Sequence, residues 1–137
     1  LLCRQKITAQ MRLVIVDDSP LMREKIREVA GMNKSVDIIG EADNGLDAIR
    51  LVEELNPDLV TLDIRMPVMN GLTALQKIRE TGSKAVLCIL TNYTDSHYRE
   101  RCLSEGANYF IGKSDGFVEL GEVIAELEQS VSENSSK

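Results

Sequence analysis

Hydrophobic and polar positions follow two periods that take turns along the chain from residue 11 to residue 131. Short runs rich in β-branched residues predict buried strands, and segments with an apolar residue every three or four positions predict amphipathic helices. The predicted strands are residues 12–17, 36–42, 58–63, 85–90 and 108–112. A predicted helix follows each of these strands.

Local residues mark several helix boundaries. Ser19 and Pro20 supply an N-cap and a first-turn proline to a helix that we expect to reach about Met32. Pro57 prevents the second helix from continuing. The polar segment 95–104 is predicted as the fourth helix. The apolar residues at helical spacing in the second, third and last helices are Leu46, Ile49, Val52 and Leu55; Leu72, Leu75 and Ile78; and Phe117, Leu120, Ile124, Leu127 and Val131.

Five alternations of strand and helix, with strands too apolar for one face to be wet, predict an α/β fold. In this fold a parallel sheet is covered by helices on both sides. We expect one domain at residues 11–131, an N-terminal extension or expression remnant at 1–10, and a flexible tail at 132–137. Ligands of such folds bind beyond the carboxyl ends of the strands. Polar residues that follow the strands are therefore the candidates for a site.

Five polar residues occupy these positions. Asp17 and Asp18 end the first predicted strand, Asp63 ends the third, Thr91 follows the fourth, and Lys113 follows the fifth. Each of them alone is more often a cap or turn residue. Because parallel strands end at the same sheet edge, however, all five are expected to lie together, which favours a functional site.

Charge indicates what this site would do. Two carboxylates about 4 Å apart repel by about 4 kcal/mol at an effective dielectric near 20. Three carboxylates on one edge therefore require a cation or a raised pKa. Mg²⁺ binds carboxylates, water and phosphate oxygens. With Lys113 and Thr91 to hold anionic oxygens and one carboxylate left to attack, the group predicts a phosphoryl-transfer site.

Composition narrows the classes of protein. The formal charge of −6 argues against a nucleic-acid or anionic-membrane surface, since both reward a basic face. No apolar run approaches the ~20 residues of a membrane span, and the first ten residues do not resemble a signal peptide. Three cysteines without metal-type spacing indicate free thiols. We therefore expect a cytoplasmic protein.

Four motifs occur in the order found in one protein family: "VIVDDSP", "LDIRMPVMNG", "LTNYTD" and "EGANYFIGKS". They contain the acidic pair, an Asp before Met-Pro and Gly, the hydroxyl, and the lysine. On these motifs, residues 11–131 resemble the receiver domain of two-component response regulators, including the single-domain type known from chemotaxis. The resemblance implies a flavodoxin-like (βα)5 sandwich whose five-stranded parallel sheet has the order 2-1-3-4-5.

The resemblance also implies roles for the site residues. Asp63 would accept a phosphoryl group from a sensor histidine kinase or phosphotransfer protein. Asp18 would bind Mg²⁺ directly and Asp17 partly through water, with Asp63 and the backbone carbonyl of Arg65 as further ligands. The chain would thus be a phosphoacceptor that catalyses its own phosphorylation and dephosphorylation, and not a turnover enzyme on external substrates.

The resemblance also implies a conformational switch at Lys113, Thr91 and Phe110. Lys113 would pair with the phosphoryl oxygens, Thr91 would move to hydrogen-bond them, and Phe110 would rotate inward. The surface remodelled in this family corresponds to residues 95–131, where an output protein would bind. The sequence does not identify that partner. Weak homodimers through the last helices are common in the family, but nothing here requires one.

Several residues depart from the commonest receiver pattern. Ser114 replaces a proline that often follows a cis bond, so we expect a trans or looser loop there. Asn92 replaces a small residue and would crowd the site. Arg65 and Tyr93 either shield the phosphoryl group from water or point to solvent. Phe110 has no phenolic hydroxyl for a hydrogen-bonded switch.

Other interpretations are weaker. "GKS" at 112–114 resembles the end of a P-loop, but the first glycine of that motif would fall on Ala107. A phosphatase of the haloacid-dehalogenase type needs an acid two residues after its nucleophile, where Asp63 is followed by Arg65. A receiver-shaped binding module that is never phosphorylated remains an alternative. His97 is expected to be an inert surface residue.

Overall fold

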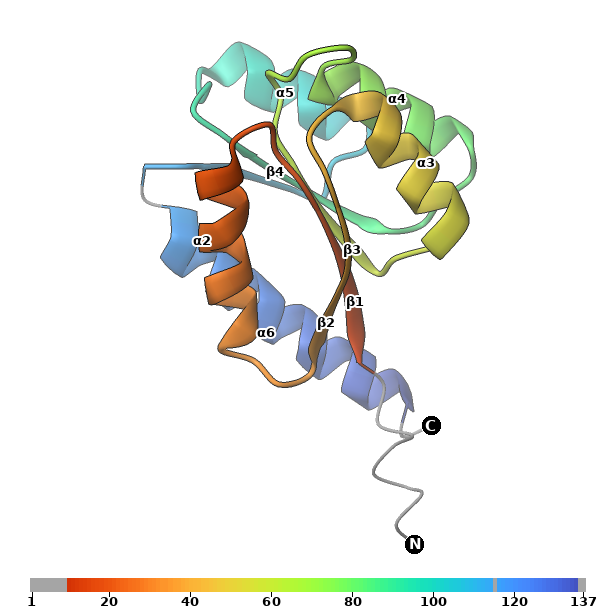
Figure 1. The fold of residues 1–137 in the computed structure, drawn as a ribbon, viewed down its shortest axis with the longest axis vertical. Helices are drawn as coiled ribbons and strands as arrows, with labels where there is room; N and C mark the ends of the chain where they lie inside the picture. The colour runs from red at the N-terminus through yellow and green to blue at the C-terminus, as the bar shows by residue number, and fades with distance from the viewer. Residues whose placement is uncertain (1–9, 115, 136–137) are drawn as a thin grey trace, which may run out of the picture.

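The computed structural model describes residues 10–114 and 116–135 (Figure 1). Strands and helices alternate along the whole of this part of the chain. In order they are β1 (Met11–Val16), α2 (Pro20–Gly31), β2 (Val36–Ala42), α3 (Gly45–Leu55), β3 (Leu59–Leu62), α4 (Gly71–Glu80), β4 (Val86–Thr91), α5 (Ser96–Ser104), β5 (Tyr109–Gly112) and α6 (Gly116–Ser135). Every predicted strand and helix is present, with boundaries displaced by a few residues at most.

The strands form a single parallel sheet in the order β2-β1-β3-β4-β5, which confirms the predicted fold class. Figure 1 shows α2 and α6 on one face of this sheet and α3, α4 and α5 on the other. The chain order reverses beside β1, so β1 and β3 lie next to each other at the centre. Their carboxyl ends are the point at which α/β folds bind ligands.

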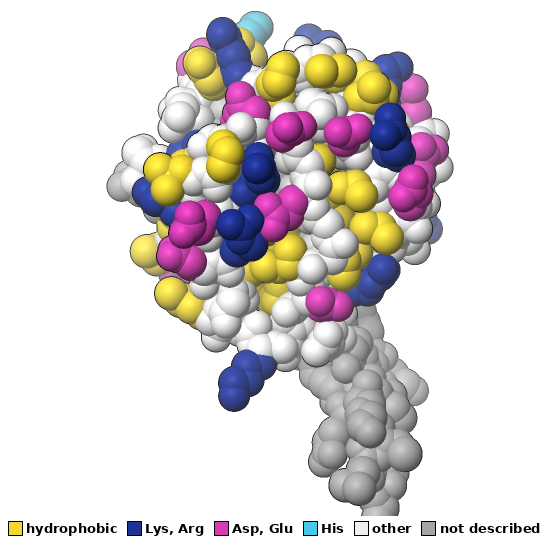
Figure 2. Space-filling model, viewed as in Figure 1, with side chains coloured by type: hydrophobic (Ala, Val, Ile, Leu, Met, Phe, Trp, Pro, Cys, Tyr) yellow, Lys and Arg dark blue, Asp and Glu magenta, His cyan; other side chains and the backbone are white. Residues whose placement is uncertain are grey.

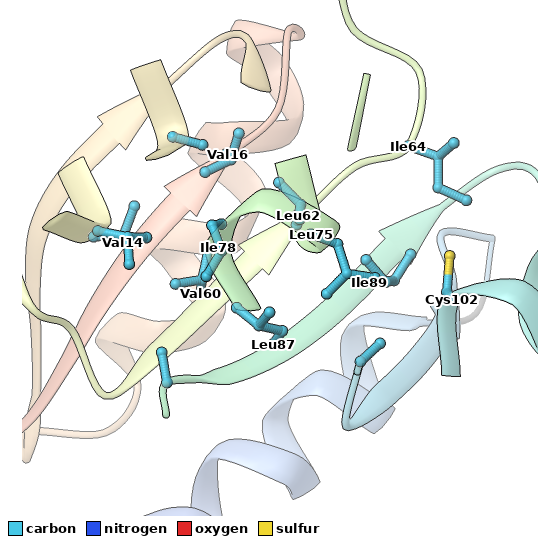
Figure 3. Packing of buried hydrophobic residues seen from close by; sticks show 14 of the residues in the cluster. Val14, Val16, Val60, Leu62, Ile64, Leu75, Ile78, Leu87, Ile89 and Cys102 are labelled. Carbon is cyan, nitrogen blue, oxygen red and sulfur yellow. The ribbon is translucent and has the colours of Figure 1, made fainter. Parts of the chain in front are cut away.

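Two hydrophobic cores hold the helices to the sheet. Successive residues of β1 point to opposite faces, so Leu13 and Ile15 pack with α2 and α6 while Val14 and Val16 pack with α3 and α4. Figure 3 shows the core that contains Val14 and Val16, in which β1, β3 and β4 pack against α4. The burial of both faces explains why the strands read as continuous apolar runs.

Capping residues explain where the helices begin. The side chain of Ser19 accepts a hydrogen bond from the backbone N–H of Met22 at 3.2 Å, as expected for an N-cap before Pro20. The last helix differs from expectation, because it continues to Ser135, past the predicted domain end at 131. No glycine or proline between 132 and 135 interrupts it. Residues 1–9 of the expected N-terminal segment and residues 136–137 of the expected tail lie outside the described residues.

Surface charge is mixed on the face that carries α2 and β2. Figure 2 shows acidic and basic side chains interspersed there. Ion pairs account for part of this pattern, since Glu41 lies 3.3 Å from Arg23 and 2.7 Å from Arg27. Within the described ranges, no helix is both long and apolar enough to cross a membrane.

Thr61, on the central strand β3, carries a buried hydroxyl that has no hydrogen-bond partner among the described residues. An unsatisfied buried hydroxyl costs about 1–3 kcal/mol, and valine has nearly the same shape. We therefore expect Thr61→Val to raise the free energy of unfolding by about 1 kcal/mol, as measured by urea denaturation. The matched control is Thr81→Val, because the Thr81 hydroxyl donates to the Ile78 carbonyl at 2.6 Å. A Thr61→Val variant no more stable than Thr81→Val would contradict the prediction.

Cys88 and Cys102 are buried on opposite faces of the sheet, and burial raises the pKa of their thiols to about 12 and about 11. Only a thiolate reacts readily with disulfide reagents. In a Cys3→Ser variant, we expect no reaction with a thiol-reactive disulfide at pH 8 in the native state and two reactive thiols in denaturant. Rapid native-state labelling of either residue would show that its core opens.

Candidate functional site

The carboxyl edge of the sheet gathers the five polar residues expected there. Asp17 and Asp18 follow β1, Asp63 follows β3, Thr91 ends β4 and Lys113 follows β5. These four strands are neighbours in the sheet. Side chains from segments that are far apart in the sequence therefore share one site.

Three carboxylates form the acidic part of this site. Asp17, Asp18 and Asp63 each offer an oxygen, and these oxygens lie within 4.8 Å of one another. Asp17 is 1% exposed and Asp63 is 5% exposed, whereas Asp18 is open to solvent. The group is therefore anchored in the protein on one side and reachable from water on the other.

Lys113 joins the two buried carboxylates. Its Nζ lies 2.8 Å from Asp17 Oδ2 and 3.0 Å from Asp63 Oδ2. Burial lowers the pKa of Lys113, but its hydrogen bonds to Asp17 and Asp63 outweigh that effect and raise the pKa overall. The ammonium therefore stays charged. It is held in place because the Lys113 backbone N–H donates to the Thr91 carbonyl at 2.8 Å, which extends the pairing of β4 with β5.

Both oxygens of Asp63 have fixed partners. Oδ1 accepts a hydrogen bond from the Ile64 backbone N–H at 2.8 Å, and Oδ2 accepts one from Lys113. Burial raises the pKa of Asp63 above its usual value, Lys113 opposes the rise, and the charge of Asp17 adds to it. The hydrogen bonds thus orient the Asp63 carboxylate, but burial and the nearby charge of Asp17 make its negative charge unfavourable. A further cation beside it would relieve this.

Two residues support the site although the sequence analysis assigned them no role. Arg23 donates to the backbone carbonyl of Asp17 at 2.6 Å and so fixes the end of β1. Gly71 donates to the Ile64 carbonyl at 2.6 Å, which folds the loop after Asp63 tightly back on itself. The glycine of "MNG" was the sequence signal for this turn, whereas an arginine in the first turn of α2 gives no comparable signal.

The structure also shows where the predicted switch residues, Thr91 and Phe110, lie. Thr91 is fully buried, and its hydroxyl accepts a hydrogen bond from the Tyr93 backbone N–H at 3.1 Å. Phe110 is buried in the core with α3, α4 and α5, so its ring already points inward. Asn92 and Ser114 are exposed, and the described residues contain no cis peptide bond. The trans form expected after β5 is therefore the one present.

Arg65 and Tyr93, which flank the site, are exposed and contact each other. The guanidinium of Arg65 lies 4.5 Å from the centre of the Tyr93 ring. From the sequence, Arg65 and Tyr93 were expected either to shield the site or to point to solvent. In the structure both side chains are exposed to solvent, and they also stack on each other. His97 is exposed in the first turn of α5 and does not belong to the acidic group.

The donor set fits a hard divalent cation. Carboxylate oxygens from Asp17, Asp18 and Asp63 converge, and the exposure of Asp18 leaves room for water ligands. A P-loop is excluded, because Tyr109–Gly112 before Lys113 is strand β5 and not a glycine-rich cradle. The arrangement is therefore suited to binding Mg²⁺ and a phosphoryl group together.

Comparison with known proteins agrees with this geometry. The family model described as "Response regulator receiver domain" matches residues 13–125. A protein-glutamate methylesterase/protein-glutamine glutaminase of Bacillus subtilis is 38% identical over 111 residues, covering 80% of this chain and 31% of that protein. The transcriptional regulatory protein YdfI of the same organism is 37% identical over 102 residues, covering 74% of this chain and 47% of that protein.

A solved structure shows the same fold. The response regulator domain of Thermotoga maritima CheB superposes with a TM-score of 0.79 at 27% identity, covering 90% of this chain and 97% of that one. The chain spans less than half the length of the two curated relatives described above, so it matches only part of each. The family model, in contrast, covers every strand of the sheet except the first two residues of β1, and it includes all five site residues. The chain therefore belongs to the response regulator receiver domain family.

Proposed function

We propose that Asp63 accepts a phosphoryl group from a phosphohistidine of a sensor kinase or phosphotransfer protein, in a reaction that requires Mg²⁺. One observation carries this proposal. The Asp63 carboxylate is held by Lys113 at 3.0 Å, and its oxygens lie within 4.8 Å of those of Asp17 and Asp18. A nucleophile, a fixed ammonium and a set of metal ligands therefore share one edge of the sheet.

Each residue has a defined part in the transfer. The P–O bond to Asp63 forms as the P–N bond of the phosphohistidine breaks, and the leaving imidazole nitrogen keeps the electron pair. Lys113 holds phosphoryl oxygens by a charge-assisted contact. Asp17 and Asp18, with the Arg65 carbonyl, would hold Mg²⁺, which supplies positive charge against the phosphoryl oxygens when bound. Catalysis consists of positioning and charge neutralisation.

Phosphorylation would then change the surface over residues 95–131. A phosphoryl group adds charge and strong hydrogen-bond acceptors next to Thr91. The Thr91 hydroxyl, which now accepts from the Tyr93 N–H, would turn to donate to a phosphoryl oxygen. Phe110 and α5 lie on the same side of the sheet and would respond to that movement.

In this role the chain acts as a regulator in the cytoplasm and not as an enzyme on external substrates. We propose that the receiver spans residues 11–131, and the family match at 13–125 supports this range. The output partner would be a protein that reads the surface over 95–131, either as a separate molecule or as part of the same polypeptide. A weak homodimer is compatible with this arrangement.

Intact-mass spectrometry with acetyl phosphate and Mg²⁺ tests the proposal. We expect the parent to gain one phosphoryl group, the gain to disappear with a chelator, and Asp63→Asn to gain none. The matched control is Asp37→Asn, since Asp37 is an exposed aspartate on β2, outside the site. Equal gains in Asp63→Asn and Asp37→Asn would refute the assignment. Absence of gain in all three folded proteins would favour a binding module that is not phosphorylated.

A further inference from the structure

A stack of three side chains joins the two loops that flank the phosphoacceptor. The guanidinium of Arg65 lies 4.5 Å from the centre of the Tyr93 ring. Tyr93 in turn meets Tyr98 edge to face, with ring centres 6.2 Å apart and planes inclined by 65°. Arg65 follows Asp63 by two residues, and Tyr93 follows Thr91 by two. The stack therefore bridges the loop after β3 and the loop after β4.

Among the described residues, no ion pair holds Arg65 in this stack. Arg65 is exposed and Tyr93 is 39% exposed, and a cation–π contact at an exposed site is weak. In the part of the chain that the structure describes, no carboxylate lies within salt-bridge distance of Arg65. Its guanidinium is therefore held by the Tyr93 ring and by a side-chain hydrogen bond to Tyr98, without an anionic partner in this part of the chain.

The charge of the site changes on phosphorylation. Three carboxylates and one ammonium, Lys113, leave a net charge of −2, which a divalent cation would bring to zero. Phosphorylation replaces the single charge of Asp63 with about −1.5 to −2. A surplus of about 0.5 to 1 negative charge then lies on Asp63, two residues before Arg65. A guanidinium binds phosphate through charge-assisted hydrogen bonds, which are stronger than an exposed cation–π contact.

The geometry points to Arg65 as a phosphoryl-responsive side chain, which exchanges the Tyr93 ring for a phosphoryl oxygen on Asp63 and thereby releases the loop after β4. This inference rests on the proposed function. The release reaches the switch hydroxyl directly, because the Tyr93 N–H donates to Thr91 Oγ1 at 3.1 Å. As Tyr93 moves, that hydrogen bond breaks and the Thr91 hydroxyl becomes free to turn toward the phosphoryl group. Arg65 thus acts as the trigger, and Tyr93 acts as the link to Thr91.

Side-chain NMR of the ¹⁵N-labelled protein tests this exchange. Over an aromatic ring, the Arg65 Nε–H resonance is shifted upfield by the ring current. On adding Mg²⁺ and acetyl phosphate, we expect it to lose that shift and move downfield, while intact mass on the same sample reports the phosphoryl group. The Arg12 Nε–H is the internal control, since its guanidinium donates to the Asn56 carbonyl at 2.9 Å at the start of β1, outside the surface over residues 95–131, and should not move.

An Arg65→Gln variant gives a second readout, because it removes the cation but keeps the backbone carbonyl. We expect the Tyr93 ring and N–H resonances of the unphosphorylated variant to move toward their positions in the phosphorylated parent. An Arg65 Nε–H that stays upfield in a parent shown by mass to be phosphorylated would overturn this inference alone. A parent that gains no phosphoryl group would overturn the proposed function and this inference together.

Discussion

Replacing Gly71 with alanine is expected to abolish phosphorylation of Asp63 and to lower the free energy of unfolding by about 3 kcal/mol. A Cβ at Gly71 would overlap the Asp63 carbonyl oxygen and lie 2.8 Å from the Asp63 carbonyl carbon and 2.9 Å from Ile64 Cα. All of these are backbone atoms and cannot rotate away. The loop would have to shift, and with it the carboxylate that the site needs to hold in place.

Gly31→Ala is the matched control, because a Cβ at Gly31 meets nothing within 4 Å. Gly31 ends helix α2, where alanine is favoured by up to about 1 kcal/mol, so this variant should be as stable as the parent or slightly more stable. Urea denaturation and phosphorylation by acetyl phosphate provide the two measurements. If Gly71→Ala matched Gly31→Ala in both stability and phosphorylation, the loop could not pack against Asp63 as closely as the structure shows.

Replacing Lys113 with methionine should cost about 3 kcal/mol of stability at neutral pH, because it leaves Asp17 and Asp63 buried without their shared cation. Mg²⁺ should restore part of this loss, since a divalent cation can take over the role of the ammonium as counter-charge. Lys84→Met, at an exposed lysine, is the control and should change stability by less than about 0.5 kcal/mol.

The pH dependence of this difference follows from the pKa of Lys113, which is raised above its ordinary value of 10.5. A lysine whose pKa is higher in the folded state stabilises fully below its unfolded pKa, and that contribution is lost as the pH rises through the folded pKa. The gap between parent and Lys113→Met should therefore be constant around neutral pH and shrink only above 10.5. Urea denaturation across this range, with a chelator and with Mg²⁺, is the measurement. The prediction would be contradicted if Lys113→Met lost no more stability than Lys84→Met and if Mg²⁺ did not change that loss.

Much of this molecule can be predicted from its sequence, because the helix and strand periods are strong and buried parallel strands are continuously apolar. The same pattern places Asp17, Asp63 and Lys113 at strand ends, so their meeting at one edge follows from the fold class. Helix α6 ends at Ser135 and not near 131, where a polar tail was expected to begin, because no glycine or proline from 132 to 135 interrupts it.

Contacts that depend on the path of a loop could not be predicted. The guanidinium of Arg79 donates to the carbonyls of Ser83, Ala85 and Gly106. It also donates to the Asn108 side chain at 2.9 Å. No periodicity or motif indicates these contacts, because they depend on how the loops after α4 and α5 fold. The stacking of Arg65 on Tyr93 belongs to the same class, since it joins loops whose spacing is set by the sheet.

Direct identification of the phosphorylated residue tests the account most sharply. The parent would be phosphorylated with acetyl phosphate and Mg²⁺, the acyl phosphate reduced with borohydride, and the reduced residue located by peptide mass spectrometry. Reduction of a phosphorylated aspartate leaves homoserine at that position. We predict homoserine at position 63 alone. Homoserine at position 17 or 18, or at another aspartate with Asp63 unmodified, would contradict the assignment of Asp63 as the phosphoacceptor.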